Sequence, residues 1–91
     1  MMYKVFPSKR FQRDLKRVER QGCRIPMLIE VVEKLAAGEK LGAKYKDHAL
    51  TGDYAGCREC HIMPDWLLVY EIYEDELILY LTRTGTHSDL F

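Results

Sequence analysis

The chain begins with an alternating pattern of apolar and polar residues and then changes to a helical one. Residues 2–6 alternate, which predicts a short strand that ends at Pro7, because proline cannot donate a ladder hydrogen bond. Ser8 is a suitable helix N-cap. The apolar residues after it recur at intervals of three and four, at Phe11, Leu15 and Val18. We therefore predict a first helix from Ser8 to about Gln21.

A second helix is predicted after the stop signal at Gly22. The helical pattern resumes at about Pro26, which is tolerated in a first turn, and continues to Ala37 before a second stop signal at Gly38. One face of this segment is apolar, with Leu28, Val32 and Leu35. The two helices are expected to form a helical hairpin.

Three segments rich in aliphatic and aromatic residues occupy the second half of the chain, at residues 54–62, 66–72 and 77–83. The short connections between them are turn-like, which predicts antiparallel strands joined as hairpins. Residues 38–53 contain many breakers and no sustained period, so we expect a long loop, a kind of segment that is often functional. The remaining tail has room for one helical turn or an extended arm.

The predicted order of elements is strand, helix, helix and then three strands. This order is typical of an α+β fold in which two helices pack on one face of a four-stranded, mainly antiparallel sheet. The other face of the sheet is expected to be open to a ligand. A chain of 91 residues has the size of one domain, and we assign residues 1–91 to it.

Composition indicates the cellular compartment in which the protein is expected. Apolar residues make up 47% of the sequence, but no run approaches the roughly 20 residues of a membrane span, so no membrane anchor is expected. The first residues lack the apolar core of a secretory signal, which favours a cytoplasmic protein. In that compartment the three cysteines are expected to be free thiols.

The formal net charge is zero, yet the charges are unevenly distributed along the chain. Residues 1–46 carry twelve Lys or Arg and five Asp or Glu, which gives +7, whereas residues 47–91 carry two and nine, which gives −7. This asymmetry suggests one basic surface for phosphates and one acidic surface elsewhere. Ordinary solvated helix faces are an alternative of similar weight, because folding can interleave the two halves.

The segment that begins at Cys57 reads CRECH, which matches the pattern that attaches a c-type haem. In a strand, however, Cys57 and Cys60 point to opposite faces, so the two thiols cannot both reach one porphyrin. A zinc site would need a second closely spaced pair of ligands. We therefore expect both cysteines to pack as small apolar residues, and we predict no haem and no metal.

All three histidines lie in or beside loops of the C-terminal half, at His48, His61 and His87. Each alone is more often a surface residue than a catalyst, but imidazole can act as base, acid or cationic phosphate partner. Asp65, just after a Met-Pro turn, can orient a ring or move a proton. The same segments contain the cations Lys44, Lys46, Arg58 and Arg83. Together these groups suit metal-free cleavage of RNA, in which the 2′-hydroxyl attacks the adjacent phosphorus.

Two blocks, YKDHALTGDYAGCRECHIMPDWLLVYEI and LTRTGTHSDLF, resemble the YafQ branch of the RelE/ParE toxin superfamily. The resemblance is carried by D-H-x-L, R-[DE]-x-H-[IV]-x-P-D and R-x-G-[ST]-H-[SA]-x-L-F, all within residues 45–91. It implies a RelE-like fold. It also implies a toxin of a type II toxin–antitoxin module, a ribosome-dependent endoribonuclease that cleaves mRNA in the A site and inhibits translation.

The resemblance assigns roles by position. The implied catalytic residues are His48, His61, Asp65, His87 and Arg83. We favour His87 and Asp65 for proton transfer, although the motif leaves acid and base open. Phe91, Lys46 and Arg58 are the implied substrate contacts.

The resemblance also implies partners. These are the ribosome, its mRNA and a cognate antitoxin similar to DinJ or RelB, with a ribbon-helix-helix module through which the pair reaches operator DNA. No cofactor is implied. The near-zero net charge departs from the strongly basic members of the superfamily and reduces the expected affinity for ribosomal RNA. The alternative function is a non-enzymatic, ParE-like toxin that binds DNA gyrase and has no need of the three histidines.

Overall fold

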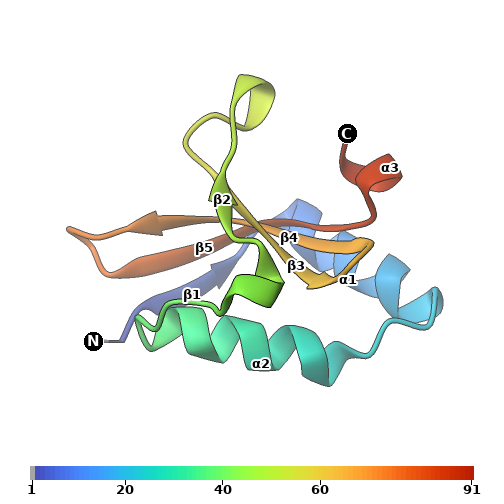
Figure 1. Cartoon of the computed structure of the whole chain (residues 1–91), viewed down its shortest axis with the longest axis horizontal. Coiled ribbons are helices and arrows are strands. Elements are labelled where there is room, and N and C mark those ends of the chain that lie inside the picture. The colour runs from blue at the N-terminus through green and yellow to red at the C-terminus, as the bar shows by residue number, and fades with distance from the viewer. Residues whose placement is uncertain (1) are drawn as a thin grey trace.

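The computed structural model describes residues 2–91. Its strands and helices, in chain order (Figure 1), are β1 (Lys4–Pro7), α1 (Lys9–Arg20), α2 (Ile25–Ala36), β2 (His48–Ala49), β3 (Arg58–Met63), β4 (Trp66–Tyr73), β5 (Ile78–Gly85) and α3 (His87–Leu90). Two 3₁₀ turns, η1 (Ala43–Tyr45) and η2 (Gly52–Tyr54), lie on either side of β2 in the connection from α2 to β3.

The strands form one sheet in the order β1-β5-β4-β3-β2. β1 and β5 run parallel, whereas the other neighbouring pairs are antiparallel, so the predicted α+β fold is confirmed. The predicted number of strands is one too low. His48 and Ala49 pair with Glu59 and Arg58 inside the segment that was expected to be a loop. Two residues are too few to produce a recognisable alternation of apolar and polar side chains.

β1 extends one residue further than predicted and includes Pro7. The backbone N–H groups of Lys4 and Ser8 donate to the carbonyls of Leu77 and Leu81, at 2.7 and 2.9 Å. Because donors alternate along a strand, the nitrogen of Pro7 faces away from β5 and toward the free edge of the sheet. Proline is tolerated there because no ladder hydrogen bond is lost.

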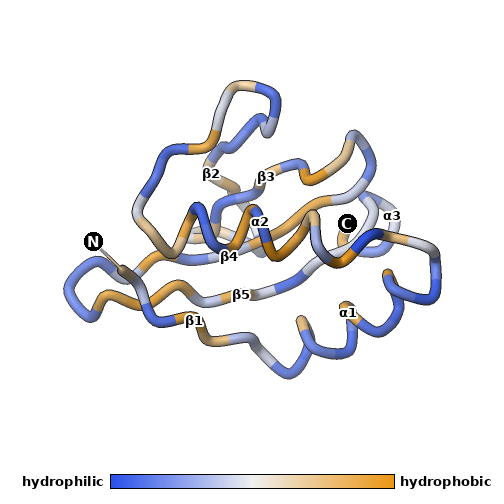
Figure 2. Tube along the Cα trace, turned by 90° about the horizontal axis from the view of Figure 1, so that it is seen from below, coloured by the Kyte–Doolittle hydropathy of each residue, from blue (hydrophilic) through white to orange (hydrophobic). Residues whose placement is uncertain are grey.

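Both helices pack on the same face of the sheet (Figure 1). α1 begins at Ser8, whose Oγ accepts a hydrogen bond from the Phe11 N–H at 2.9 Å, and it buries Phe11, Asp14 and Val18. Figure 2 shows the rest of α1 as largely hydrophilic. α2 has Pro26 in its first turn, as predicted. None of the helices within residues 2–91 has the length and apolarity needed to cross a membrane.

Hydrophobic clusters lie on both faces of the sheet. The larger one, between the helices and the sheet, contains Cys60, whereas a smaller one on the other face contains Cys57 and Leu90 of α3. The two cysteines therefore pack on different faces, as predicted, and both thiols are free. The face that was expected to be open is partly covered by α3, and the uncovered part next to it carries the candidate site.

Candidate active site

A buried carboxylate lies between two histidines at the centre of the site. Side chains alternate along β3, so Glu59 and His61 share the face opposite to that of Cys60. The pairing of β2 with β3 places His48 across from Glu59. Glu59 Oε1 lies 3.5 Å from His48 Nε2 and 3.6 Å from His61 Nε2, and Glu59 is only 3% exposed. The carboxylate of Glu59 thus orients both rings. It forms an ion pair with either histidine when that imidazole is protonated.

Backbone carbonyls contact the other nitrogen of each ring. His48 Nδ1 lies 2.7 Å from the carbonyl oxygen of Lys46, and His61 Nδ1 lies 3.3 Å from that of Pro64. A carbonyl can only accept, so Nδ1 is the donor in both contacts. Lys46 has a left-handed backbone with a φ of 48°, and the chain turns there just before β2. Each of the two histidines is therefore held at both of its ring nitrogens.

Five aromatic rings follow one another across this face of the sheet. We call them the ring row, and in spatial order they are His48, His61, His87, Phe91 and Tyr54. Successive ring centroids are 6.5, 6.0, 5.9 and 5.2 Å apart. The structure thus brings together three histidines that are far apart in the sequence. Phe91 is 59% exposed, so its ring is available to stack on a base.

α3 and the β3–β4 turn complete the site. α3 carries His87 and begins with a capping box, in which Thr86 Oγ1 accepts from the Asp89 N–H and the Asp89 carboxylate accepts from the Thr86 N–H. Asp65 lies in the turn and accepts a hydrogen bond from the His87 N–H at 3.4 Å. Asp65 therefore contacts the backbone of His87 and helps to hold the start of α3 beside the turn.

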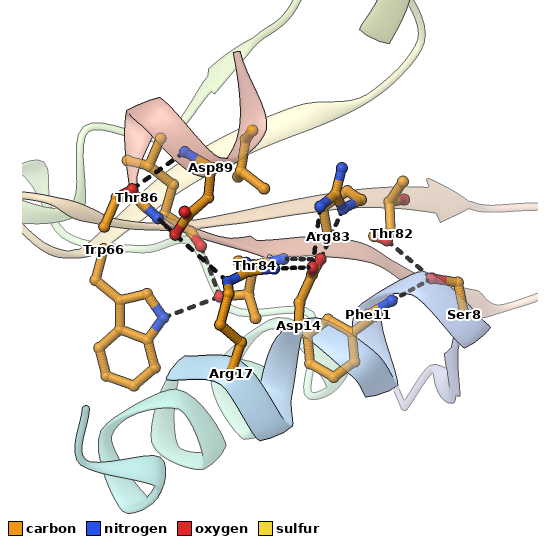
Figure 3. A network of polar contacts seen from close by, with 12 residues as sticks. Ser8, Phe11, Asp14, Arg17, Trp66, Thr82, Arg83, Thr84, Thr86 and Asp89 are labelled. Atoms are coloured by element: carbon orange, nitrogen blue, oxygen red, sulfur yellow. Dashed lines mark hydrogen bonds and ion pairs between the residues drawn. The ribbon is translucent and has the colours of Figure 1, made fainter. Parts of the chain in front are cut away.

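Arg83 is bound by a carboxylate from α1 (Figure 3). Its Nε and Nη2 donate to Asp14 at 2.6 and 2.9 Å, and the side chain is only 11% exposed. Burial alone would raise the pKa of Asp14, but the hydrogen bonds from Arg83, the Thr84 N–H and Arg17 outweigh it and lower that pKa. The hydrogen bonds to Asp14 raise the pKa of Arg83, and Tyr54 of the ring row raises it further. Arg83 is thus a permanently charged group next to the ring row.

Arg58 and Lys46, the two cations that the resemblance assigned to substrate binding, have different surroundings. Arg58 Nε donates to Asp47 Oδ1 at 3.0 Å, and Tyr70 donates to the other oxygen of Asp47 at 2.5 Å. Lys46 lines a pocket of about 470 Å³ together with His61. The roles of both cations in substrate binding stay predictions.

The sequence prediction missed two buried acids, Glu59 and Asp14, although the sequence contains a signal for each. Glu59 stands two residues before His61 in a predicted strand, which places both on one face. Asp14 falls between Phe11 and Val18 at helical spacing, so it lies on the apolar face of α1. An acid on an apolar face indicates a buried partner, and here that partner is Arg83.

Replacement of Asp14 by asparagine should make the stability of the protein depend less on pH in the acid range. Because the folded state lowers the pKa of Asp14, its carboxylate stabilises the protein above the unfolded value of about 3.9. That contribution disappears as the pH falls through the lowered pKa. The melting temperature of the wild-type protein should fall as the pH is lowered below about 5. Asp14→Asn should melt lower at neutral pH and change less in acid.

Thermal denaturation followed by circular dichroism across this range measures the difference. The matched control is Asp53→Asn, since Asp53 is exposed in η2. It should keep the wild-type acid dependence. Equal acid slopes for Asp14→Asn and wild type would contradict the assigned role of Asp14.

Comparison with known proteins gives consistent results. Residues 3–91 match the family model described as "Bacterial toxin of type II toxin-antitoxin system, YafQ". The mRNA interferase toxin YafQ of Escherichia coli K12 is 47% identical over 51 residues, which cover 56% of this chain and 53% of that protein. The chain thus spans about half the length of this curated relative.

Solved structures match over the whole chain. The crystal structure of a metal-bound toxin from Helicobacter pylori has a TM-score of 0.91 and 45% identity, and it covers 100% of both chains. YafQ in the E. coli DinJ-YafQ toxin-antitoxin complex has a TM-score of 0.89 and 32% identity, over 100% of this chain and 99% of that one. Within residues 2–91 of the present chain, no group of three or more His, Cys, Asp or Glu side chains is arranged to hold a metal ion.

The fold and the sequence matches together define a RelE-like bacterial toxin of a type II toxin–antitoxin system. The chain belongs to the YafQ family, and the model of that family extends over nearly all of it.

Proposed function

We propose that this chain is an endoribonuclease that cleaves mRNA in the ribosomal A site and thereby stops translation. The observation that carries the proposal is the ring row, in which three imidazoles lie within one continuous row beside a buried carboxylate. A protein that acted by binding alone would have no need of this arrangement. The name of the E. coli relative, mRNA interferase toxin, supports the same activity.

The proposed reaction is an internal phosphoryl transfer. A base removes the proton of the 2′-hydroxyl, the 2′-oxygen forms a bond to the adjacent phosphorus, and the bond to the 5′-oxygen breaks. An acid protonates the departing 5′-oxygen. The products are a 2′,3′-cyclic phosphate and a 5′-hydroxyl, and no metal takes part in the proposed steps.

The contacts of each group suggest its role. His48 and His61 are each contacted at both ring nitrogens around Glu59, which fixes the two imidazoles in position beside the negative charge of the phosphate. His87 lies between His61 and the exposed Phe91 and is itself exposed, which suits proton exchange with the substrate. We assign proton transfer to His87 and Asp65 and charge stabilisation to Arg83.

The test uses translating ribosomes that carry a defined mRNA, and the 3′ ends of the fragments are mapped. The protein should cut within the A-site codon and leave a cyclic phosphate. A matched mRNA with a single 2′-deoxy nucleotide at the cut position should remain intact, because the nucleophile is missing. Continued cleavage of the deoxy message would exclude internal attack.

A second arm addresses metal. Free RNA is incubated with the protein in the presence and absence of EDTA, since chelation in the ribosomal assay would also remove ribosomal magnesium. Any cleavage of free RNA should be unaffected by EDTA, and loss of cleavage would overturn the metal-free mechanism.

We further propose that a cognate antitoxin with a ribbon-helix-helix module binds this chain and blocks the ring row. The E. coli homologue, whose structure matches the whole chain, was crystallised in complex with DinJ. Because His87 and Phe91 are exposed, a segment of the antitoxin that covered them would exclude RNA.

A further inference from the structure

Arg17 belongs to the basic helix α1, yet its guanidinium faces the end of the sheet and the tail (Figure 3). Nη1 donates to Asp14 at 2.9 Å, and Nη2 donates to the carbonyl oxygen of Thr84 at 3.0 Å. Nε lies 3.5 Å from Oδ2 of Asp89. Nε is buried without a hydrogen-bond partner, so the Asp89 carboxylate supplies the compensating charge at this point. One side chain thus links α1, β5 and α3.

Gly85 makes this close approach possible. A Cβ atom at this position would lie 2.6 Å from Arg17 Nη2 and 3.1 Å from Asp89 Oδ2. The φ of Gly85 is +155°, a conformation that residues with a side chain rarely adopt. Gly85 therefore leaves the space between β5 and α3 that the guanidinium occupies.

We propose that Arg17 is a positioning residue that fixes α3, and with it His87 and Phe91, in the ring row. α3 has only four residues, and a helix of that length is not stable in isolation. Its capping box depends on the Asp89 carboxylate, and that carboxylate is also the partner of Arg17. Loss of Arg17 removes the link from this carboxylate to the body of the protein.

The catalytic part of this inference rests on the proposed function, because it concerns the rate at which His87 acts. The structural part does not. Arg17 would hold the tail in place whatever reaction the ring row performs.

The alternative role for an arginine on a basic helix is direct contact with RNA phosphates. The two roles predict different kinetics. Removal of a phosphate contact weakens binding and reduces its salt dependence. Loss of a positioning residue lowers kcat, because a catalytic group displaced by about 1 Å costs up to about 100-fold. Arg13 is a matched control, since it lies on the same helix and is exposed.

In the ribosomal cleavage assay, Arg17→Ala should lower kcat by about 10- to 100-fold and leave KM and its salt dependence close to wild type. Arg13→Ala should keep kcat. Arg17→Lys should recover only part of the rate, because an ammonium cannot bridge three acceptors with the geometry of a guanidinium. Gly85→Ala should also lower kcat, because the new Cβ meets the same guanidinium and alanine disfavours the φ of Gly85 beside α3.

Amide hydrogen exchange measures how firmly α3 is held, and the measurement needs no RNA. The N–H groups of Asp89, Leu90 and Phe91 donate to carbonyls of Thr86 and His87, so they report on the last turn. They should exchange faster in Arg17→Ala and Gly85→Ala, while the amides of β4 stay protected in both variants. The ring resonances of His87 should shift in the same variants.

The outcomes separate the two proposals. Faster exchange of α3 together with a wild type that cuts no RNA would overturn the proposed function and leave the positioning role intact. Unchanged exchange of α3 together with an unchanged kcat would overturn the positioning role. A higher KM with a reduced salt dependence and an unchanged kcat would also overturn it and assign Arg17 to RNA contact.

Discussion

Replacement of His87 by alanine is expected to lower the rate of mRNA cleavage by about 10²- to 10⁴-fold, the range for loss of a general acid or base. His87 stands in the middle of the ring row, with His61 at 6.0 Å on one side and Phe91 at 5.9 Å on the other. Its ring is exposed, so its removal leaves no cavity in the core. The effect should therefore appear in kcat, with little change in melting temperature. Single-turnover cleavage on programmed ribosomes and thermal denaturation measure the two quantities.

Ser88→Ala is the matched control for this prediction, because Ser88 is the exposed neighbour of His87 in α3. It should cleave at the wild-type rate. Equal rates for the His87 variant and wild type would contradict the assigned proton transfer.

The same experiment can be extended to the alternative function. A variant with all three histidines replaced should no longer arrest growth when it is expressed. Undiminished growth arrest would favour a ParE-like toxin that binds DNA gyrase, since binding alone does not need the imidazoles.

Replacement of Asp14 by alanine is expected to reduce the free energy of unfolding by about 3–5 kcal/mol, the range for breaking a buried ion pair from one side. Asp14 is 2% exposed and accepts hydrogen bonds from Arg83, Arg17 and the Thr84 N–H. Without it, the guanidinium of Arg83 stays buried with no opposite charge. Chemical denaturation in urea measures the loss. A change below about 1 kcal/mol, the value of a surface pair, would show that the network contributes little.

The double variant Asp14→Leu with Arg83→Met separates the structural role of Arg83 from its proposed catalytic role. Replacing both partners of a buried pair by apolar residues of similar size is often neutral or stabilising. The double variant should therefore regain part of the lost stability, although the Thr84 N–H and Arg17 still lose their acceptor. It should still cleave slowly, since the cation beside the ring row is gone. Because Asp14 also contacts Arg17, slow cleavage counts for Arg83 only if the amides of α3 exchange as in wild type. Full activity in a stable double variant would limit Arg83 to a structural role.

The sequence predicted the fold well where its signals were local. Pro7, Ser8 and Gly22 mark the ends of elements through their own backbone chemistry, and the structure places boundaries within one or two residues of them. β2 was missed because its two residues gain their strand geometry only from pairing with β3. The parallel pairing of β1 with β5 is equally invisible in local patterns, because it is a contact between distant segments.

In the site, too, local motifs were predicted from the sequence, whereas contacts between distant residues were not. The motifs pointed to His48, His61 and His87, and the structure brings their rings into one row. Glu59 and Asp14 were missed although their spacing places one on the face of His61 and the other on the apolar face of α1, because the spacing does not name the partner of either acid. What decides the role of each acid is a partner far along the chain, Arg83 for Asp14 and His48 for Glu59. The first contact depends on how α1 packs on β5 and the second on the pairing of β2 with β3, and neither can be read from a local sequence pattern.

The pairing of β1 with β5 has a consequence for how the protein is made. During synthesis, β1 and α1 are made before β5, so until β5 is added β1 lacks its neighbour and Asp14 lacks Arg83. Contacts between segments so distant in sequence form late in folding. The ring row is likewise incomplete until His87 and Phe91 have been added to the chain. If the chain cleaves mRNA as proposed, an unfinished chain that still lacks His87 and Phe91 has no complete ring row and should not cut RNA.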